Sequence, residues 1–213
     1  MISFKQFLRE ADDSQDAREF FHREAAPFID QAEGAGVLVR GTHHSPPVYK
    51  TVTLPSGKEI TVHRMEVRKD RKPMDMPREA HEIADKFMKD KFGIAGRSGT
   101  AFVVGAVNSE LAAGYGDLYA VIPQGEFRYI WSPKTMDLYD YFEYTGFDGR
   151  ARGMETPEKI SMWREELEGM KYQDTDLPRA IRSGFEVMLE CDHLLLVRVD
   201  DDEILDELYK VLR

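Results

Sequence analysis

The sequence is poor in cysteine and has no long apolar run. Cys191 is the only cysteine among 213 residues, so no disulfide can form within the chain. A lone thiol in an apolar stretch indicates a reducing compartment. No apolar run approaches the ~20 residues that a membrane-spanning helix needs, and the N-terminus lacks the apolar core of a secretory signal. We therefore expect a protein that does not cross a membrane and is not exported by the usual route.

The chain also lacks an excess of positive charge. It contains 29 Lys and Arg against 39 Asp and Glu, a formal net charge of −10. Strong nonspecific binding to nucleic acid is therefore not expected, although a local basic groove stays possible. Hydrophobic residues make up 42% of the chain, which favours a folded body. The length allows one substantial domain, or one domain with an appendage.

Hydrophobic periodicity predicts short strands scattered among helices. Helices are expected at 17–32 (interrupted at Pro27), 78–92, 109–113, 157–170 and 204–212. Strands are expected at 37–39, 51–53, 59–62, 101–104, 117–123, 127–131, 185–189 and 194–199. There is no internal repeat and no regular alternation of strand and helix, so the pattern favours the α+β class.

Three features at predicted strand ends suggest chemistry. Arg40 ends an apolar strand, where its guanidinium could hold a phosphate or diphosphate. Residues 99–123 contain glycines that would let a flat ligand approach the backbone, and Tyr115 or Tyr119 could stack on a ring. Glu186 begins an apolar strand, where a buried carboxylate is costly unless it is used. The alternatives are a surface arginine, ordinary turn glycines and a glutamate that faces solvent.

In this order the three features resemble the motifs of the mono-ADP-ribosyltransferase family. The matching segments are 37–41 for the first motif, 97–102 followed by 112–115 for the second, and 186–189 for the third. The resemblance covers roughly residues 36–199 and is carried by short motifs. It implies an α+β fold with split mixed and antiparallel β-sheets and flanking helices, over residues 34–213.

The resemblance also implies NAD as cofactor and a set of site residues. The positions it assigns to NAD binding are Arg40, Gly41, Ser98, Thr100 and Tyr115. Glu186 would be catalytic, by hydrogen-bonding the ribose 2′-hydroxyl and stabilising positive charge on the ribose as nicotinamide leaves. Val103-Val104-Gly105 replaces the usual Ser-Thr-Ser, so Ser98 or Thr100 would have to substitute. Gly184 stands where arginine-modifying members carry Glu or Gln. No metal is implied.

The first ten residues form a short amphipathic pattern of their own. In MISFKQFLREA the apolar residues Phe4, Phe7, Leu8 and Ala11 recur at helical spacing. The peptide resembles the capsid-targeting peptides of internal head proteins of large contractile-tailed bacteriophages, which end in Leu or Ile, any residue, and Glu before a small residue. This implies a cleavable targeting helix at 1–10, cut between Glu10 and Ala11, and then a linker and N-terminal helix at 11–33. A plain docking helix is the alternative.

The two resemblances together predict an enzyme that is packaged in a phage head and injected with the genome. Its partners would be the prohead core and prohead protease through residues 1–10, and then a host macromolecule as acceptor. It would lie in the virion head interior and later in the host cytoplasm. Two alternatives stay open. One is a catalytically inactive ADP-ribosyltransferase-like protein that binds a host factor. The other is an acidic internal head protein that mimics nucleic acid.

Overall fold

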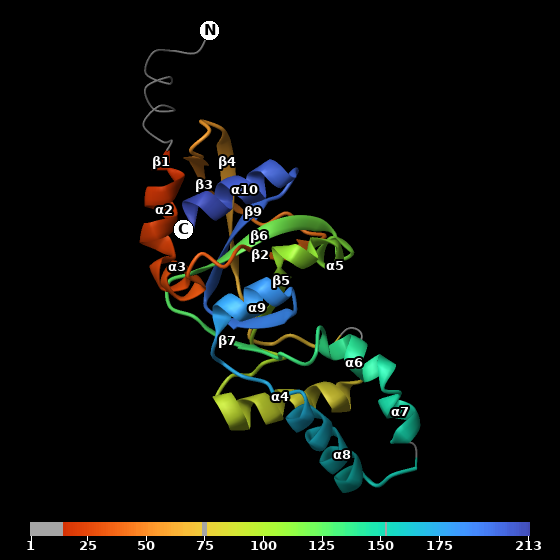
Figure 1. Cartoon of the computed structure of the whole chain (residues 1–213). Helices are drawn as coiled ribbons and strands as arrows, with labels where there is room; N and C mark the ends of the chain where they lie inside the picture. Colours follow the sequence, from red (N-terminus) through yellow and green to blue (C-terminus); the bar gives the residue numbers. More distant parts are fainter. Residues whose placement is uncertain (1–14, 74–75, 152) are drawn as a thin grey trace.

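The computed structural model describes residues 15–73, 76–151 and 153–213. The predicted targeting peptide and its cleavage site at Glu10 and Ala11 lie outside the described residues. Within those residues the strands form one nine-stranded mixed sheet in the order β1-β3-β4-β9-β6-β2-β5-β8-β7 (Figure 1). The strands are β1 (Gln15–Asp16), β2 (Leu38–Thr42), β3 (Val48–Thr53), β4 (Glu59–Glu66), β5 (Ala101–Gly105), β6 (Asp117–Gln124), β7 (Arg128–Trp131), β8 (Glu186–Glu190) and β9 (His193–Arg198). The α+β class expected from the sequence is confirmed.

The two separate sheets implied by the family resemblance are not found among the described strands. Strand β2 joins the strands β1-β3-β4-β9-β6 to the strands β5-β8-β7, because its first residues pair with a neighbour on each side. It pairs with β6 along its whole length, from Leu38 to Thr42. With β5 it pairs only through Leu38 with Gly105 and Val39 with Val104. Beyond Val39 the pairing of β2 with β5 ends, so the sheet is continuous but opens at this point.

Helices cover both faces of this sheet. They are α2 (Ala17–Glu24), α3 (Ala26–Ala32), α4 (Arg78–Phe92), the 3₁₀ turn η1 (Ala106–Asn108), α5 (Ser109–Ala113), α6 (Leu138–Tyr144), α7 (Phe147–Arg150), α8 (Thr156–Gly169), α9 (Leu177–Ser183) and α10 (Asp202–Val211). Helices α2 and α10 lie at one end of the molecule, where Arg18 donates to the Lys210 carbonyl at 2.5 Å. Helices α4, α6, α7 and α8 form the other end (Figure 1). No helix in the described ranges combines the length and the apolar character needed to cross a membrane.

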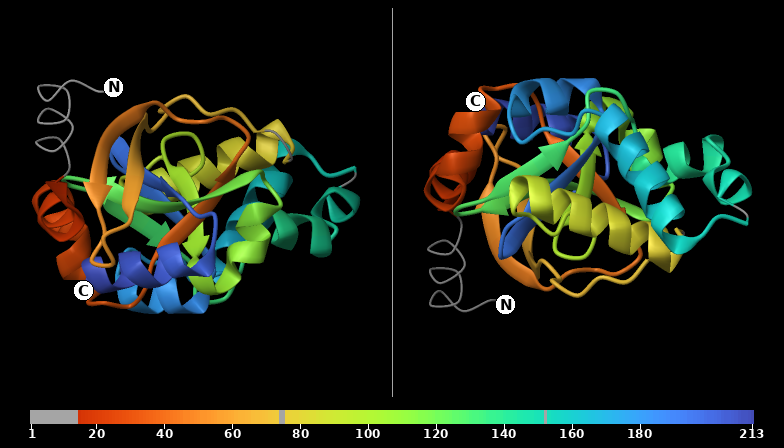
Figure 2. Two further views of the ribbon diagram at one scale, coloured as in Figure 1. Left: turned by 90° about the horizontal axis from the view of Figure 1, so that it is seen from above. Right: turned by 90° about the horizontal axis from the view of Figure 1, so that it is seen from below.

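The two larger hydrophobic cores lie on opposite faces of β7 and β8, and a small third core contains Val39, Val104 and Ala112. The larger core contains side chains of α2, α3, α9 and α10, and the second contains those of α4, α6, α7 and α8. Strand β8 contributes to both, since Val187 and Leu189 belong to the first core and Met188 to the second. This is the period of two expected of a strand that is covered on both faces. Figure 2 shows α4 lying across the strands when the molecule is seen from below.

The described part of the predicted linker and N-terminal helix packs into the larger core. Asp16 caps α2 by accepting from the Glu19 amide at 3.0 Å, and Phe20 and Phe21 are buried. The expected break in the helix at Pro27 occurs at Ala25 instead. Pro27 lies in the first turn of α3, where its missing N–H would have no partner within the helix. Residues 15–33 are therefore part of the body.

Candidate active site

A cleft of about 380 Å³ lies where β2 and β5 diverge. This volume is within the range of about 300–1,000 Å³ that small-molecule sites usually occupy. Four predicted site residues line it: Arg40 and Gly41 from β2, Tyr115 from the turn after α5, and Glu186 from β8. These residues come from three distant segments of the chain, so the fold brings together what the sequence suggested only by order.

Glu186 lies in the wall of the cleft as half of a buried ion pair. Arg97 Nη1 donates to both carboxylate oxygens, at 3.2 Å and 3.4 Å. The two residues are only 7% and 6% exposed. The Leu138 amide also donates to the carboxylate at 3.4 Å. Burial raises the pKa of Glu186, while the Arg97 charge and these hydrogen bonds act in the opposite direction.

Two guanidinium groups contact the ring of Phe102 beside this pair. The Cζ atom of Arg71 lies 3.9 Å from the ring centroid, and that of Arg97 lies 4.2 Å away. Arg71 also donates to the Thr100 carbonyl at 2.9 Å. Burial, together with the nearby charges of Arg40 and Arg97, lowers the pKa of Arg71 to about 10. Several positive charges are therefore held close together in the cleft.

Arg40 and Gly41 occupy the part of β2 that is no longer paired with β5. Arg40 is half-buried, and burial lowers its pKa. Its Nε atom is buried and has no hydrogen-bond partner among the described residues. A Cβ atom at Gly41 would collide with the Ala112 carbonyl oxygen, so this glycine lets α5 pack closely on β2. Its role in the structure is the placement of α5 at the cleft, whereas the sequence suggested close approach of a ligand.

Ser98 and Thr100 do not line the cleft, contrary to the prediction. The Ser98 hydroxyl donates to Asp85 of α4 at 2.7 Å, and the Thr100 hydroxyl donates to the Gly96 carbonyl. Asp85 also accepts from the Arg97 amide at 2.8 Å. The two hydroxyl groups therefore fix the segment before β5, and the side chain from this segment that pairs with Glu186 is that of Arg97.

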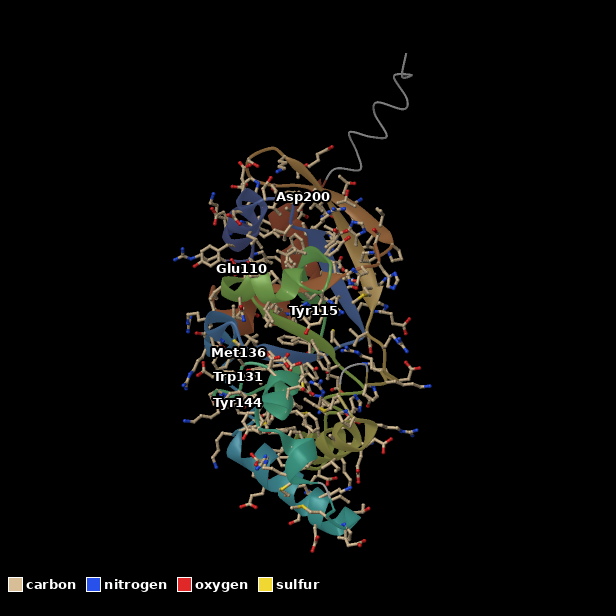
Figure 3. The ribbon with its side chains drawn as sticks, turned by 90° about the vertical axis from the view of Figure 1, so that its right-hand side faces the viewer. Glu110, Tyr115, Trp131, Met136, Tyr144 and Asp200 are labelled. Atoms are coloured by element: carbon tan, nitrogen blue, oxygen red, sulfur yellow. The ribbon has the colours of Figure 1, made fainter. Side chains whose placement is uncertain are left out.

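Tyr115 lies at the mouth of the cleft and is 54% exposed. Its amide donates to the Ala112 carbonyl at 3.0 Å, which closes the turn after α5. Figure 3 shows Tyr115 and Met136 between α5 and α6, on the same side of the molecule. Tyr139 of α6 also lines the cleft. The mouth thus carries two aromatic side chains that a planar ring could contact.

Several residues of the cleft were not identified as site residues from the sequence. They are His81, Arg97, Phe102, Asp137 and Tyr139, together with Arg71 and Lys72 of a basic loop at residues 68–72. Asp137 caps α6 by accepting from the Tyr139 and Asp140 amides, at 2.7 Å and 3.1 Å. The run of Arg and Lys at 68–72 was the available signal for Arg71. Arg97 lies inside the segment that resembles the second family motif.

The charge of the cleft is opposite to that of the chain. It contains four Arg and Lys side chains, Arg40, Arg71, Lys72 and Arg97, against two carboxylates, Asp137 and Glu186. A cation-rich cleft in a protein of net charge −10 favours an anionic ligand. No group of three or more His, Cys, Asp or Glu side chains in the described part of the chain is placed to hold a metal ion.

Comparison of the chain with protein-family models, with curated proteins and with solved structures gives no match.

Proposed function

We propose that this protein is an NAD-dependent mono-ADP-ribosyltransferase that modifies a host macromolecule. The observation that carries the proposal is the convergence of Arg40, Tyr115 and Glu186 on one cation-rich cleft. The three residues belong to segments that resemble the three motifs of that family, in the same order along the chain.

The donor set of the cleft fits a dinucleotide. Arg40 and Arg71 would hold the diphosphate, since arginine binds phosphate oxygens through paired N–H groups. The unpartnered Nε atom of Arg40 is a donor that a phosphate oxygen would satisfy. Tyr115 would contact the nicotinamide ring at the mouth of the cleft.

The proposed reaction uses these residues as follows. NAD⁺ supplies the ribosyl group and the leaving group: the bond from ribose C1′ to the nicotinamide nitrogen breaks, nicotinamide keeps the electron pair, and the acceptor atom bonds to C1′ and releases its proton. Glu186 would accept a hydrogen bond from the ribose 2′-hydroxyl, and its charge would stabilise the positive charge that develops on the ribose. Arg40 would supply binding energy away from the reacting carbon.

The turn before β8 favours an acceptor other than arginine. Gly184, two residues before Glu186, has a positive φ of 69°, and a Cβ atom there would lie 2.9 Å from the Cβ of Asn108. A Glu or Gln side chain of the kind carried by arginine-modifying members of the family is therefore strongly disfavoured at this position.

We further propose that residues 1–10 target the protein to the phage head. The protein would be packaged through the prohead core, cut by the prohead protease after Glu10, and injected into the host cytoplasm. Mass spectrometry of the protein from mature heads should find Ala11 at its N-terminus. An intact Met1 in mature heads would reject this part of the proposal.

A catalytically inactive protein that binds a host factor is the second candidate. The burial of Glu186 and its pairing with Arg97 favour it, because both limit the access of a ligand to the carboxylate. Incubation with labelled NAD⁺ and host lysate separates the two candidates. The wild type should transfer label, Glu186→Gln should not, and Glu190→Gln, at the other end of β8, should match the wild type. Absence of transfer by the folded wild type would reject the enzyme.

A further inference from the structure

The carboxylate of Glu186 needs a partner that holds it in one orientation. A buried carboxylate is costly unless it is paired, and a catalytic one must also point toward its substrate. Under the family resemblance, the hydroxyl group of Ser98 would position either the ribose or this glutamate. Ser98 and Thr100 cannot hold the carboxylate, since their hydroxyl groups donate to Asp85 and to the Gly96 carbonyl.

We infer that Arg97 is the positioning residue for Glu186, an assignment that rests on the proposed function. Its guanidinium holds the carboxylate by two contacts, at 3.2 Å and 3.4 Å, inside the wall of the cleft. Both side chains are more than nine-tenths buried, so water does not compete for these contacts.

Arg97 is itself held from two directions. Its guanidinium lies 4.2 Å from the centroid of the Phe102 ring. Its backbone amide donates to Asp85 of α4 at 2.8 Å, and the following amide, that of Ser98, donates to the same oxygen at 2.9 Å. Helix α4 therefore fixes the chain from which Arg97 extends, and the aromatic ring restricts where the guanidinium can lie. A positioning residue needs this kind of support.

The other charged groups around Glu186 do not replace Arg97. Asp137, before α6, raises the pKa of Glu186, as burial does. Tyr172, after α8, is buried, and its pKa is raised well above the usual value. Arg71 contacts the same Phe102 ring, donates to the Thr100 carbonyl and forms no hydrogen bond to Glu186 within the described residues. Removal of Arg97 would take away the largest influence that favours the charged form of Glu186, so burial and the Asp137 charge would be opposed mainly by the hydrogen bond from the Leu138 amide.

The first experiment measures the pKa of Glu186 without turnover. Carbon-13 NMR of the glutamate carboxyl groups follows the titration, and Glu186→Gln identifies the signal. Because an opposite charge within about 4–6 Å lowers a carboxyl pKa by roughly 1–3 units, Arg97→Met should raise this pKa by about that amount. Arg128→Met is the matched control, since Arg128 pairs with Glu190 at the far end of β8. A Glu186 pKa that does not rise in folded Arg97→Met would overturn the inference.

The second experiment measures kcat against pH with NAD⁺. In Arg97→Met the acidic limb should move to higher pH by the same roughly 1–3 units, so kcat measured on that limb should fall roughly tenfold or more while KM changes little. Arg97→Lys keeps the positive charge but loses the planar guanidinium group. This variant replaces Arg97→Met in the experiment if Arg97→Met does not fold. It should keep the pH profile and lower kcat, and an unchanged kcat would overturn the inference.

The two experiments separate the inference from the proposed function. If the wild type shows no turnover with NAD⁺ but the Glu186 pKa rises in Arg97→Met, the proposed reaction fails and the control of the carboxylate by Arg97 stands. If turnover is present and neither the pKa nor the pH profile responds to Arg97→Met, the enzyme stands and the inference fails.

Discussion

The two ends of strand β8 carry the same pair of residue types in different surroundings. Glu186 at the start of the strand pairs with Arg97, and both side chains are buried. Glu190 at the end pairs with Arg128, whose Nε atom lies 2.7 Å from Glu190 Oε2, and these side chains are 24% and 55% exposed. The alternation of the strand turns both carboxylates toward the face of Met188. Only the covering elements, which include the segment before α6, bury the first pair in the wall of the cleft and leave the second pair partly exposed.

The largest effect should come from breaking the buried pair. Arg97→Met leaves the Glu186 carboxylate without its partner, and loss of one partner of a buried pair typically costs about 3–5 kcal/mol of stability. Arg128→Met should cost about 1 kcal/mol or less, because its pair is partly exposed. Urea unfolding of both variants measures the difference. Equal losses at the two ends would contradict the comparison.

The second largest effect should be the difference in turnover between variants of Glu186 and of Glu190. Glu186→Gln should lower kcat by about 10²–10³-fold with little change in NAD⁺ affinity, since the charge acts on the transition state. Glu190→Gln should leave kcat unchanged. Transfer of label from NAD⁺ measures both rates, and circular dichroism checks that both variants fold. Equal turnover by the two variants would make Glu186 a structural residue.

Arg40 should affect binding and not the chemical step. Arg40→Met removes a charged donor for the diphosphate, a loss of about 1.5–3 kcal/mol, or roughly 10–100-fold in affinity for NAD⁺. Arg68→Met is the control, because Arg68 forms an exposed pair with Asp70 in the basic loop. Calorimetry with NAD⁺ and with inorganic pyrophosphate measures both variants. A normal affinity of Arg40→Met for both ligands would remove Arg40 from the site.

The smallest expected effect is the pH dependence of stability. Because burial outweighs Arg97, the pKa of Glu186 is raised in the folded protein. Such a group stabilises the fold below its unfolded pKa of about 4.3, and this contribution is lost as pH rises through the folded pKa. The stability of the wild type relative to Glu186→Gln should therefore decrease as pH rises over this interval. Urea unfolding at a series of pH values measures it, and an increase would mean that Arg97 outweighs burial.

Much of the local structure was predictable because it depends on local periodicity. The helix at 78–92 has the predicted bounds, and the strands expected at 51–53 and 59–62 lie within β3 and β4, which pair with each other. Helices α6, α7 and α9 were not predicted. Each is seven residues or shorter, and at this length tertiary packing decides whether a helix forms. Ile181 of α9 belongs to the larger core, which supplies that packing.

The site was predictable in its outline and not in its internal contacts. The residue types and their order identified Arg40, Tyr115 and Glu186, because arginine, aromatic and carboxylate groups at strand ends carry recognisable chemistry. The choice between the hydroxyl groups and Arg97 depends on which side chain turns toward β8. That direction is fixed by Asp85 on α4, which binds the backbone of Arg97 and the Ser98 hydroxyl.

The sequence by itself determined the fold class, the acidic charge, most element positions and the candidate residues, since composition and periodicity encode these locally. Only the tertiary structure decided that β2 and β5 pair briefly and then separate to form a cleft. It also decided that Arg97 meets Glu186 across 89 residues of chain. Contacts between distant segments depend on sheet register and on which face of the sheet a helix covers. The residues next to a contact determine neither of these.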